Sequence, residues 1–245
     1  MLAFLMMGQS NMAGRGSLTE LPEIIDARVQ VLRDGAWLPA REPVVMDKPA
    51  LAGAGLGLAF GTTLAMLTGE TIGLIPCAMG GSALSEWMPG EPLLMQTLEA
   101  ARQALASGAQ LSGVLWHQGE HDSGHAELAA TYAKRLLHMM VALESGLRES
   151  AAALGCSDLV RDPLPLLAGE LGNYLDRQPD SLYHQEINRQ LAYVAAQRPA
   201  SVCVRAADLP DKGDALHFSA SAQRRLGVRY ASAWMDLCAQ SGGSC

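Results

Sequence analysis

Several features that would indicate a metal framework, a disulfide scaffold or a polyanionic partner are missing from this sequence of 245 residues. Its five cysteines are odd in number and widely scattered, and no two of them form a Cys-x-x-Cys pair. Neither a disulfide framework nor a zinc ribbon is therefore indicated, and we expect a reducing compartment. No long basic run occurs and the net charge is −7, which argues against a nucleic-acid partner because such binding depends on neutralising phosphates.

The sequence also lacks a segment that would cross a membrane or direct export. The first apolar run, residues 3–7, is far too short to span a bilayer, and no charged segment precedes it. We therefore expect a core strand here, no membrane partner and a cytoplasmic location, although a sequence from which an export signal had been removed would look the same. Nothing in the sequence indicates an oligomeric state.

What the sequence does contain is a regular alternation of apolar patterns. Hydrophobic residues make up 49% of the chain, enough for one domain with a substantial core. Strands are predicted at residues 3–7, 71–75, 113–116, 164–168 and 201–205, and helices at 56–68, 92–107, 127–143, 181–197 and 219–237. This order predicts a single α/β domain over residues 1–240, with a five-stranded parallel sheet and helices on both faces. The tail, residues 241–245, is expected to be disordered.

Two further segments contain glycines that suggest particular structures. Residues 29–38 alternate on either side of an Asp-Gly pair, which predicts a hairpin that we interpret as a surface excursion. Residues 53–57, Gly-Ala-Gly-Leu-Gly, superficially suggest a dinucleotide loop, but no convincing strand precedes them and their spacing does not fit G-x-G-x-x-G. We therefore expect no cofactor.

Polar clusters follow four of the predicted strands. They begin at Gly8, Ala78, His117 and Asp208. Because the C-terminal ends of parallel strands face one crevice, these clusters should meet at one edge of the sheet. Ser10 lies in the first cluster and is a candidate nucleophile, although a loop serine taken alone is most often structural. A serine nucleophile also needs a base and donors for the oxyanion.

Asp214 and His217 are the candidates for that base and its partner. An aspartate three residues before a histidine can bend back to accept a hydrogen bond from Nδ1–H, which leaves Nε2 free to take the proton of Ser10. For the oxyanion, Gly81 has no Cβ to block close approach, and the Gln118 amide can donate without acting as a base. The N–H of Ser10 is the remaining candidate donor.

A metal site is the competing interpretation of the third cluster. His117, His121 and His125 recur every four residues, with Glu120 and Asp122 between them, and on a helix they would share one face. However, His117 lies at a predicted strand end, and two glycines interrupt any helix. We therefore favour polar loop residues over metal ligands.

Four segments together resemble the sequence blocks of the SGNH hydrolase superfamily. In order, they are Gly8-Gln9-Ser10-Asn11-Met12, Gly80-Gly81-Ser82, Trp116-His117-Gln118-Gly119-Glu120 and Asp214-Ala215-Leu216-His217. Within the superfamily they are similar to the branch of carbohydrate esterase family 6 and the sialate O-acetylesterases. The resemblance implies a three-layer flavodoxin-like fold. It also implies metal-free removal of O-acetyl groups from a small acetylated sugar or oligosaccharide, of the acetylxylan or sialate type, through an acetyl-enzyme.

The resemblance also implies the role of each site residue. Ser10 would be the nucleophile, His217 the base and Asp214 its partner, with Ser10, Gly81 and Gln118 forming the oxyanion hole. Glu120 is the alternative acidic member, but the spacing to His217 favours Asp214. Trp87 is either a platform for a sugar ring or a structural tryptophan. A non-catalytic carbohydrate-binding protein on the same fold and a metal-dependent deacetylase are the alternative functions.

Overall fold

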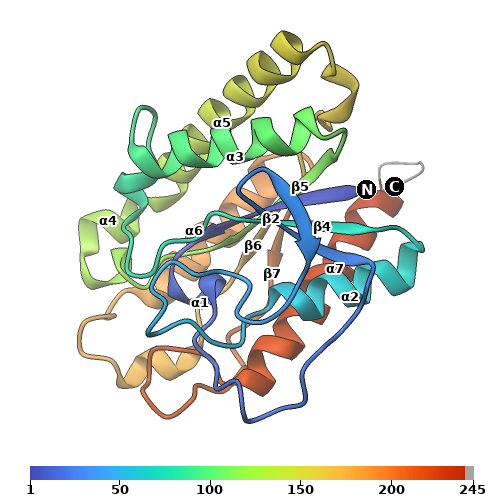
Figure 1. Ribbon diagram of the computed structural model, residues 1–245. Helices are drawn as coiled ribbons and strands as arrows, with labels where there is room; N and C mark the ends of the chain where they lie inside the picture. The colour runs from blue at the N-terminus through green and yellow to red at the C-terminus, as the bar shows by residue number, and fades with distance from the viewer. Residues whose placement is uncertain (241–245) are drawn as a thin grey trace.

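The computed structural model describes residues 1–240, and its strands form one seven-stranded sheet (Figure 1). The tail that the sequence predicts to be disordered, residues 241–245, lies outside the described residues. In chain order the strands are β1 (Leu2–Gly8), β2 (Val29–Arg33), β3 (Ala36–Pro39), β4 (Ile72–Pro76), β5 (Gln110–His117), β6 (Leu166–Gly169) and β7 (Ser201–Val204). Their order across the sheet is β3-β2-β4-β1-β5-β6-β7.

The prediction of five strands is wrong, because the sheet has seven. The five predicted strands correspond to β1, β4, β5, β6 and β7, which run parallel. The other two strands come from the predicted hairpin, whose turn places Asp34 and Gly35 at φ 48° and 77°, as a two-residue hairpin turn requires. This hairpin is not a surface excursion. Buried Val29 and Val31 pack into the core, and β2 pairs in parallel with β4, leaving β3 as the antiparallel edge.

Helices cover both faces of the sheet, as predicted (Figure 1). On one face α2 (Gly57–Thr68) packs against α7 (Ala220–Gln240). On the other, α5 (Tyr132–Leu154) packs between α3 (Pro92–Ala106) and α6 (His184–Gln197). The helix predicted at 127–143 is in fact two, because α4 (Ala126–Ala130) ends before α5 begins. Among residues 1–240, no helix is both long enough and apolar enough to cross a membrane.

The central strand β1 holds the layers together. All seven of its residues are buried, which is why it appears in the sequence as a continuous apolar run rather than an alternating one. The Phe4 ring packs edge-on against Phe60 of α2 and Trp234 of α7, with ring centroids 4.8 and 5.6 Å apart. This packing attaches α2 and α7 to the sheet directly behind the strand that leads to Ser10.

The C-terminal end of β1 lies between those of β4 and β5. Met79 donates its N–H to the Gly8 carbonyl oxygen at 2.9 Å, and Gln9 donates its N–H to the His117 carbonyl oxygen at 2.9 Å. The loops that follow three separate strands are therefore joined by backbone hydrogen bonds. As expected for parallel strands, the polar clusters after β1, β4 and β5 share one edge of the sheet.

Candidate active site

Three side chains at this edge form a continuous chain of hydrogen bonds. The Oγ of Ser10 lies 3.0 Å from Nε2 of His217, and Nδ1 of His217 lies 2.7 Å from Oδ2 of Asp214. The other carboxylate oxygen of Asp214 accepts the backbone N–H of His217 at 2.8 Å. Nucleophile, base and orienting carboxylate thus stand in the order that activates a serine.

Ser10 is held in place by the sharp turn from β1 into the short helix α1 (Ser10–Ala13). Gly8 has a φ of 127°, and a Cβ there would lie 2.1 Å from the His117 carbonyl oxygen, so only glycine permits this approach. Ser10 is 7% exposed and occupies the first position of α1. Its N–H is one of those that have no acceptor within their own helix.

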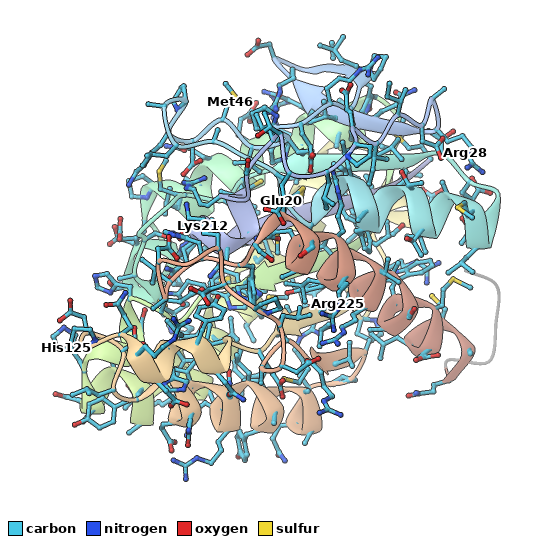
Figure 2. All side chains as sticks on the ribbon, turned by 90° about the horizontal axis from the view of Figure 1, so that it is seen from below. Glu20, Arg28, Met46, His125, Lys212 and Arg225 are labelled. Carbon is cyan, nitrogen blue, oxygen red and sulfur yellow. The ribbon has the colours of Figure 1, made fainter. Side chains whose placement is uncertain are left out.

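The loop that carries His217 is shaped by local hydrogen bonds. Oδ2 of Asp211 accepts the N–H of Gly213 at 3.0 Å and that of Ala215 at 2.7 Å, which stabilises Ala215 at its positive φ of 56°. Lys212 donates its Nζ to the Arg15 carbonyl oxygen at 3.3 Å and so ties the loop to the segment after α1. Figure 2 shows Lys212 on this loop, and His125 at the left edge of the molecule in that view.

The electrostatics of the site suit a general base. Burial lowers the pKa of His217 below its ordinary value even though Asp214 raises it, and the positive charges of Lys212 and Arg15 lower it further. Burial alone would raise the pKa of Asp214, but hydrogen bonds from the His217 ring and backbone N–H groups outweigh it and lower the pKa to about 2. At neutral pH the imidazole is therefore neutral and the carboxylate charged.

Glu120, the alternative acidic member, faces a different group. Its Oε1 accepts a hydrogen bond from Nδ2 of Asn11 at 2.5 Å, and within residues 1–240 no hydrogen bond joins it to His217. Burial raises the pKa of Glu120 to about 7, against the lowering effect of the Asn11 hydrogen bond. The geometry favours Asp214 as the partner of His217.

Gly81 lies in the turn after β4 with an unused backbone donor. Its φ of 81° lies in the left-handed region that favours glycine. Within the described part of the chain, the Gly81 N–H donates to no acceptor, whereas the N–H of Gly80 is bound to Asp47 at 2.7 Å. Gly81 is therefore able to donate to a developing oxyanion.

Gln118 is placed differently from what the sequence predicts. Its side chain is fully buried, and its Nε2 donates to the Ser82 carbonyl oxygen at 3.1 Å and to Oδ2 of Asp122 at 2.7 Å. Its Oε1 accepts the Tyr132 hydroxyl at 2.7 Å. Since both amide hydrogens already have protein acceptors, this geometry argues against Gln118 as an oxyanion donor.

Gln9 is the side chain that the sequence reasoning missed. Its Oε1 accepts the N–H of Gly119 at 3.4 Å and that of His121 at 3.3 Å, which fixes the orientation of the amide. Among the described residues its Nε2 group has no acceptor, and Gln9 lines the same pocket as Gly81. The signal in the sequence was its position directly before Ser10.

Trp87 is fully buried, which favours the structural alternative over a sugar platform. Its Nε1 donates to Oγ of Ser82 at 3.0 Å, and its ring packs edge-on against Trp116 with centroids 5.6 Å apart. The turn Leu84–Trp87 directs the ring into the core, because burying its large apolar surface there is more favourable than exposing it. Trp87 offers no face to a ligand.

A pocket of about 460 Å³ opens beside these groups. It is lined by Gln9, Gly81, Glu120, His121, Gly124, His125, Gln178, Pro179, Asp180, Ser181 and Leu216. His121 and His125 are exposed at this pocket whereas His117 is fully buried, and nowhere in residues 1–240 do three or more His, Cys, Asp or Glu side chains form a group that could hold a metal ion. A second pocket, about 490 Å³, lies between β7 and α7 and contains no member of the Ser10 site.

The helix-flanked sheet, with Ser10 after β1 and His217 in the loop before α7, is the fold of the SGNH-type hydrolases. Over residues 1–236 the chain matches the family described as carbohydrate esterase, sialic acid-specific acetylesterase, and it belongs to this family. It is 31% identical over 256 residues to a probable carbohydrate esterase of Arabidopsis thaliana, which covers 95% of this chain and 90% of that relative.

Solved structures have a similar fold. An X-ray structure of an Arabidopsis thaliana protein has a TM-score of 0.81 and 26% identity to this chain, covering 96% of this chain and 98% of the other. The crystal structure of NanS has a TM-score of 0.76 and 17% identity, covering 97% of each chain. At that identity the likeness to NanS shows the shared fold alone.

Proposed function

We propose that this carbohydrate esterase removes O-acetyl groups from small acetylated sugars or oligosaccharides, with Ser10 as its nucleophile. The observation that carries the proposal is the hydrogen-bonded chain from Ser10 through His217 to Asp214. Membership of the family supports an esterase acting on carbohydrates. The pocket beside Ser10 supports a substrate of the size of a sugar rather than a long polymer segment.

In the proposed first step, Nε2 of His217 takes the proton of Ser10 as Oγ attacks the acetyl carbonyl carbon. The N–H groups of Ser10 and Gly81 and the Nε2 amide of Gln9 donate to the oxyanion that forms. When the tetrahedral intermediate collapses, the bond from the carbonyl carbon to the sugar oxygen breaks, and His217 gives its proton to that oxygen. The sugar leaves with a free hydroxyl group, and Ser10 carries the acetyl group.

In the second step, water replaces the sugar. His217 takes a proton from the water as the water oxygen attacks the carbonyl carbon of the acetyl-enzyme. The same donors hold the oxyanion that forms, and the bond from the carbonyl carbon to Oγ then breaks. Oγ regains a proton from His217 and acetate leaves. Throughout, the Asp214 carboxylate holds the Nδ1–H tautomer and stabilises the imidazolium.

The sugar would occupy the pocket beside Gly81. Its lining is rich in groups that hydrogen-bond hydroxyls, among them His121, His125, Gln178 and Asp180. Such a lining suits a polyhydroxylated leaving group better than an alkyl chain. Acetylated xylo-oligosaccharides and O-acetylated sialic acids are the two substrate types to compare, by measuring the acetate released from each.

Replacing Ser10 by alanine tests the proposal. We expect the wild type to hydrolyse a chromogenic acetate ester and to be labelled by a fluorophosphonate, and Ser10→Ala to lose about 10⁴-fold or more in kcat with no labelling, because the nucleophile is absent. Ser17→Ala, which changes an exposed serine nearby, is the matched control and should behave as wild type. Substantial activity in Ser10→Ala would refute the assignment.

Two further outcomes would favour the alternative functions. Loss of wild-type activity on treatment with a chelator would favour a metal-dependent deacetylase. Tight sugar binding without hydrolysis or labelling of the wild type would favour a non-catalytic carbohydrate-binding protein.

A further inference from the structure

The side chain of Asn11 brackets the backbone of His217. Its Nδ2 donates to the carbonyl oxygen of Leu216 at 3.1 Å, and its Oδ1 accepts the N–H of Phe218 at 3.1 Å. One planar amide therefore binds the residue before the base and the residue after it. Asn11 is fully buried, and its own carbonyl oxygen accepts Nε2 of Gln223 at 3.0 Å. This bond ties α1, which carries both Ser10 and Asn11, to α7.

Glu120 adds a further contact that favours this orientation of the amide, beside the Leu216 and Phe218 contacts and the Tyr174 hydroxyl, which lies 3.3 Å from Nδ2 of Asn11. Oε1 of Glu120 accepts the second Nδ2 hydrogen of Asn11. If the amide were turned over, Oδ1 would face the carboxylate and the Leu216 carbonyl oxygen, and Nδ2 would face the N–H of Phe218. All three contacts would then be repulsive, because the amide oxygen would face two acceptors and the amide nitrogen would face a donor. The 4% exposure of Glu120 removes the water that could compensate for such contacts.

The other contacts of His217 come from its own loop and from Ser10: its ring bonds Asp214 and Ser10, and its carbonyl oxygen accepts the Lys212 N–H at 2.9 Å. Its side chain is 17% exposed, and its partner Asp214 is 36% exposed, on a loop at the surface of the site. The hydrogen bonds of Asp211 to Gly213 and Ala215 shape this loop but do not reach the helix of the nucleophile. The Asn11 amide is a buried contact that joins the backbone on both sides of the base directly to that helix.

We infer that Asn11 and Glu120 act as a pair of positioning residues that align Nε2 of His217 with Ser10 Oγ, although neither touches the reacting atoms. The inference rests on the proposed function, since it assigns the pair a role in activating Ser10. Misplacing a catalytic group by about 1 Å can cost 10²-fold in rate. Losing the Asn11 amide, which does not line the sugar pocket, should therefore lower kcat while leaving KM nearly unchanged.

The test compares Asn11→Ala with a control that loses the same kind of contacts elsewhere. In α6, Asn188 also brackets a backbone segment, accepting the Leu171 N–H at 2.7 Å and donating to the Leu171 carbonyl oxygen at 3.0 Å. We expect Asn11→Ala to lose about 10²-fold in kcat, with KM within about threefold and a similar fall in the rate of fluorophosphonate labelling. Asn188→Ala should keep kcat within about twofold, whatever its melting temperature.

Variants of Glu120 keep the inference testable if Asn11→Ala does not fold. Glu120→Gln retains an oxygen that can accept from Asn11 and should keep kcat within about tenfold, whereas Glu120→Leu should lose about as much as Asn11→Ala. Because the two residues act as a unit, the double variant Asn11→Ala with Glu120→Leu should be no slower than the slower single variant.

Two results would overturn the inference: an unchanged labelling rate in Glu120→Leu, or equal losses of kcat in Asn11→Ala and Asn188→Ala. Either result counts against the inference only if the wild-type protein is active. An inactive and unlabelled wild type would instead refute the proposed function, so the two failures are distinguishable.

Discussion

Two polar networks lie at the same edge of the sheet, and they differ in whether their hydrogen-bond donors are already used. The open network consists of Ser10, His217, Asp214, Gln9 and Gly81. The closed network consists of Gln118, Asp122, Ser82, Trp87 and Tyr132. In the open network the Gln9 amide and the Gly81 N–H have no acceptor within residues 1–240. In the closed network both amide hydrogens of Gln118 have acceptors within the protein.

The closed network has a structural explanation. Asp122 accepts the N–H of Leu84 at 2.9 Å as well as the Gln118 amide, and it forms an ion pair with Arg135 at 2.8 Å. These contacts attach the segment after β4 to the end of β5 and so hold Gly81 in place. The comparison teaches that a polar side chain at a strand end is available for chemistry only when the fold leaves its donor without a partner.

The largest expected effect in either network is that of Asp214→Asn. The asparagine can no longer hold the Nδ1–H tautomer of His217, so we expect kcat to fall about 10³- to 10⁴-fold on a chromogenic acetate ester. Asp122→Asn is the matched change in the closed network and should lower the melting temperature while keeping kcat within about tenfold. Equal losses of kcat in the two variants would remove the distinction between the networks.

The two glutamines provide the next test. Gln9→Met removes a free donor and should lower kcat about 10²- to 10³-fold. It also removes the acceptor of the Gly119 and His121 N–H groups, so its stability should fall as well. Gln118→Met removes the donor to the buried Ser82 carbonyl oxygen and one of the donors to Asp122, so the free energy of unfolding should fall by about 1–3 kcal/mol, with kcat within about tenfold. Urea titration and steady-state kinetics measure the two effects. The reverse pattern would make Gln118 the oxyanion donor.

The remaining prediction concerns the pH dependence of stability that Glu120 confers. Its pKa is raised from an ordinary value of 4.5 to about 7 in the folded protein, mainly by burial. Between these pH values the folded protein binds a proton that the unfolded chain has lost. The stabilisation that this group contributes is therefore fully present below about pH 4.5, and on the order of 3 kcal/mol of it is lost as the pH rises through 7.

Glu120→Gln lacks this proton equilibrium. The stability of the wild type relative to Glu120→Gln should therefore decrease steadily from pH 4.5 to pH 8, as measured by urea unfolding at each pH. A difference that is independent of pH would show that Glu120 has the same pKa in both states.

The strands and helices were predictable to different extents. β1, β4 and β5 are buried on both faces and so appear as continuous apolar runs, which made them easy to predict. The position of β2 in the sheet was not easy to predict, because a short strand after an irregular segment can pair with a neighbouring strand or remain on the surface. Its pairing with β4, nearly forty residues later in the chain, is a long-range contact that local alternation does not encode.

The site shows the same limit at the level of single side chains. Ser10, Asp214 and His217 could be predicted because a triad needs those residue types, and the Asp-x-x-His spacing lets the last two meet locally. Gln9 and Gln118 carry the same amide, and each follows a strand. Asp122, four residues after Gln118, accepts from its amide, but the residue types alone do not show that this contact forms. The aromatic ring of Trp87 likewise gave no sign of whether it would face ligand or core.

The sequence by itself determined the residue types at the ends of the strands, the order in which they occur and the apolar runs that make the strands buried. Only the tertiary structure decided which of those polar groups remain free to act. One of the two acceptors that occupy Gln118 belongs to Ser82, 36 residues away in the chain, and the amide that brackets His217 comes from Asn11, near the other end of the sequence. A donor's availability depends on such distant atoms, and folding alone brings them together.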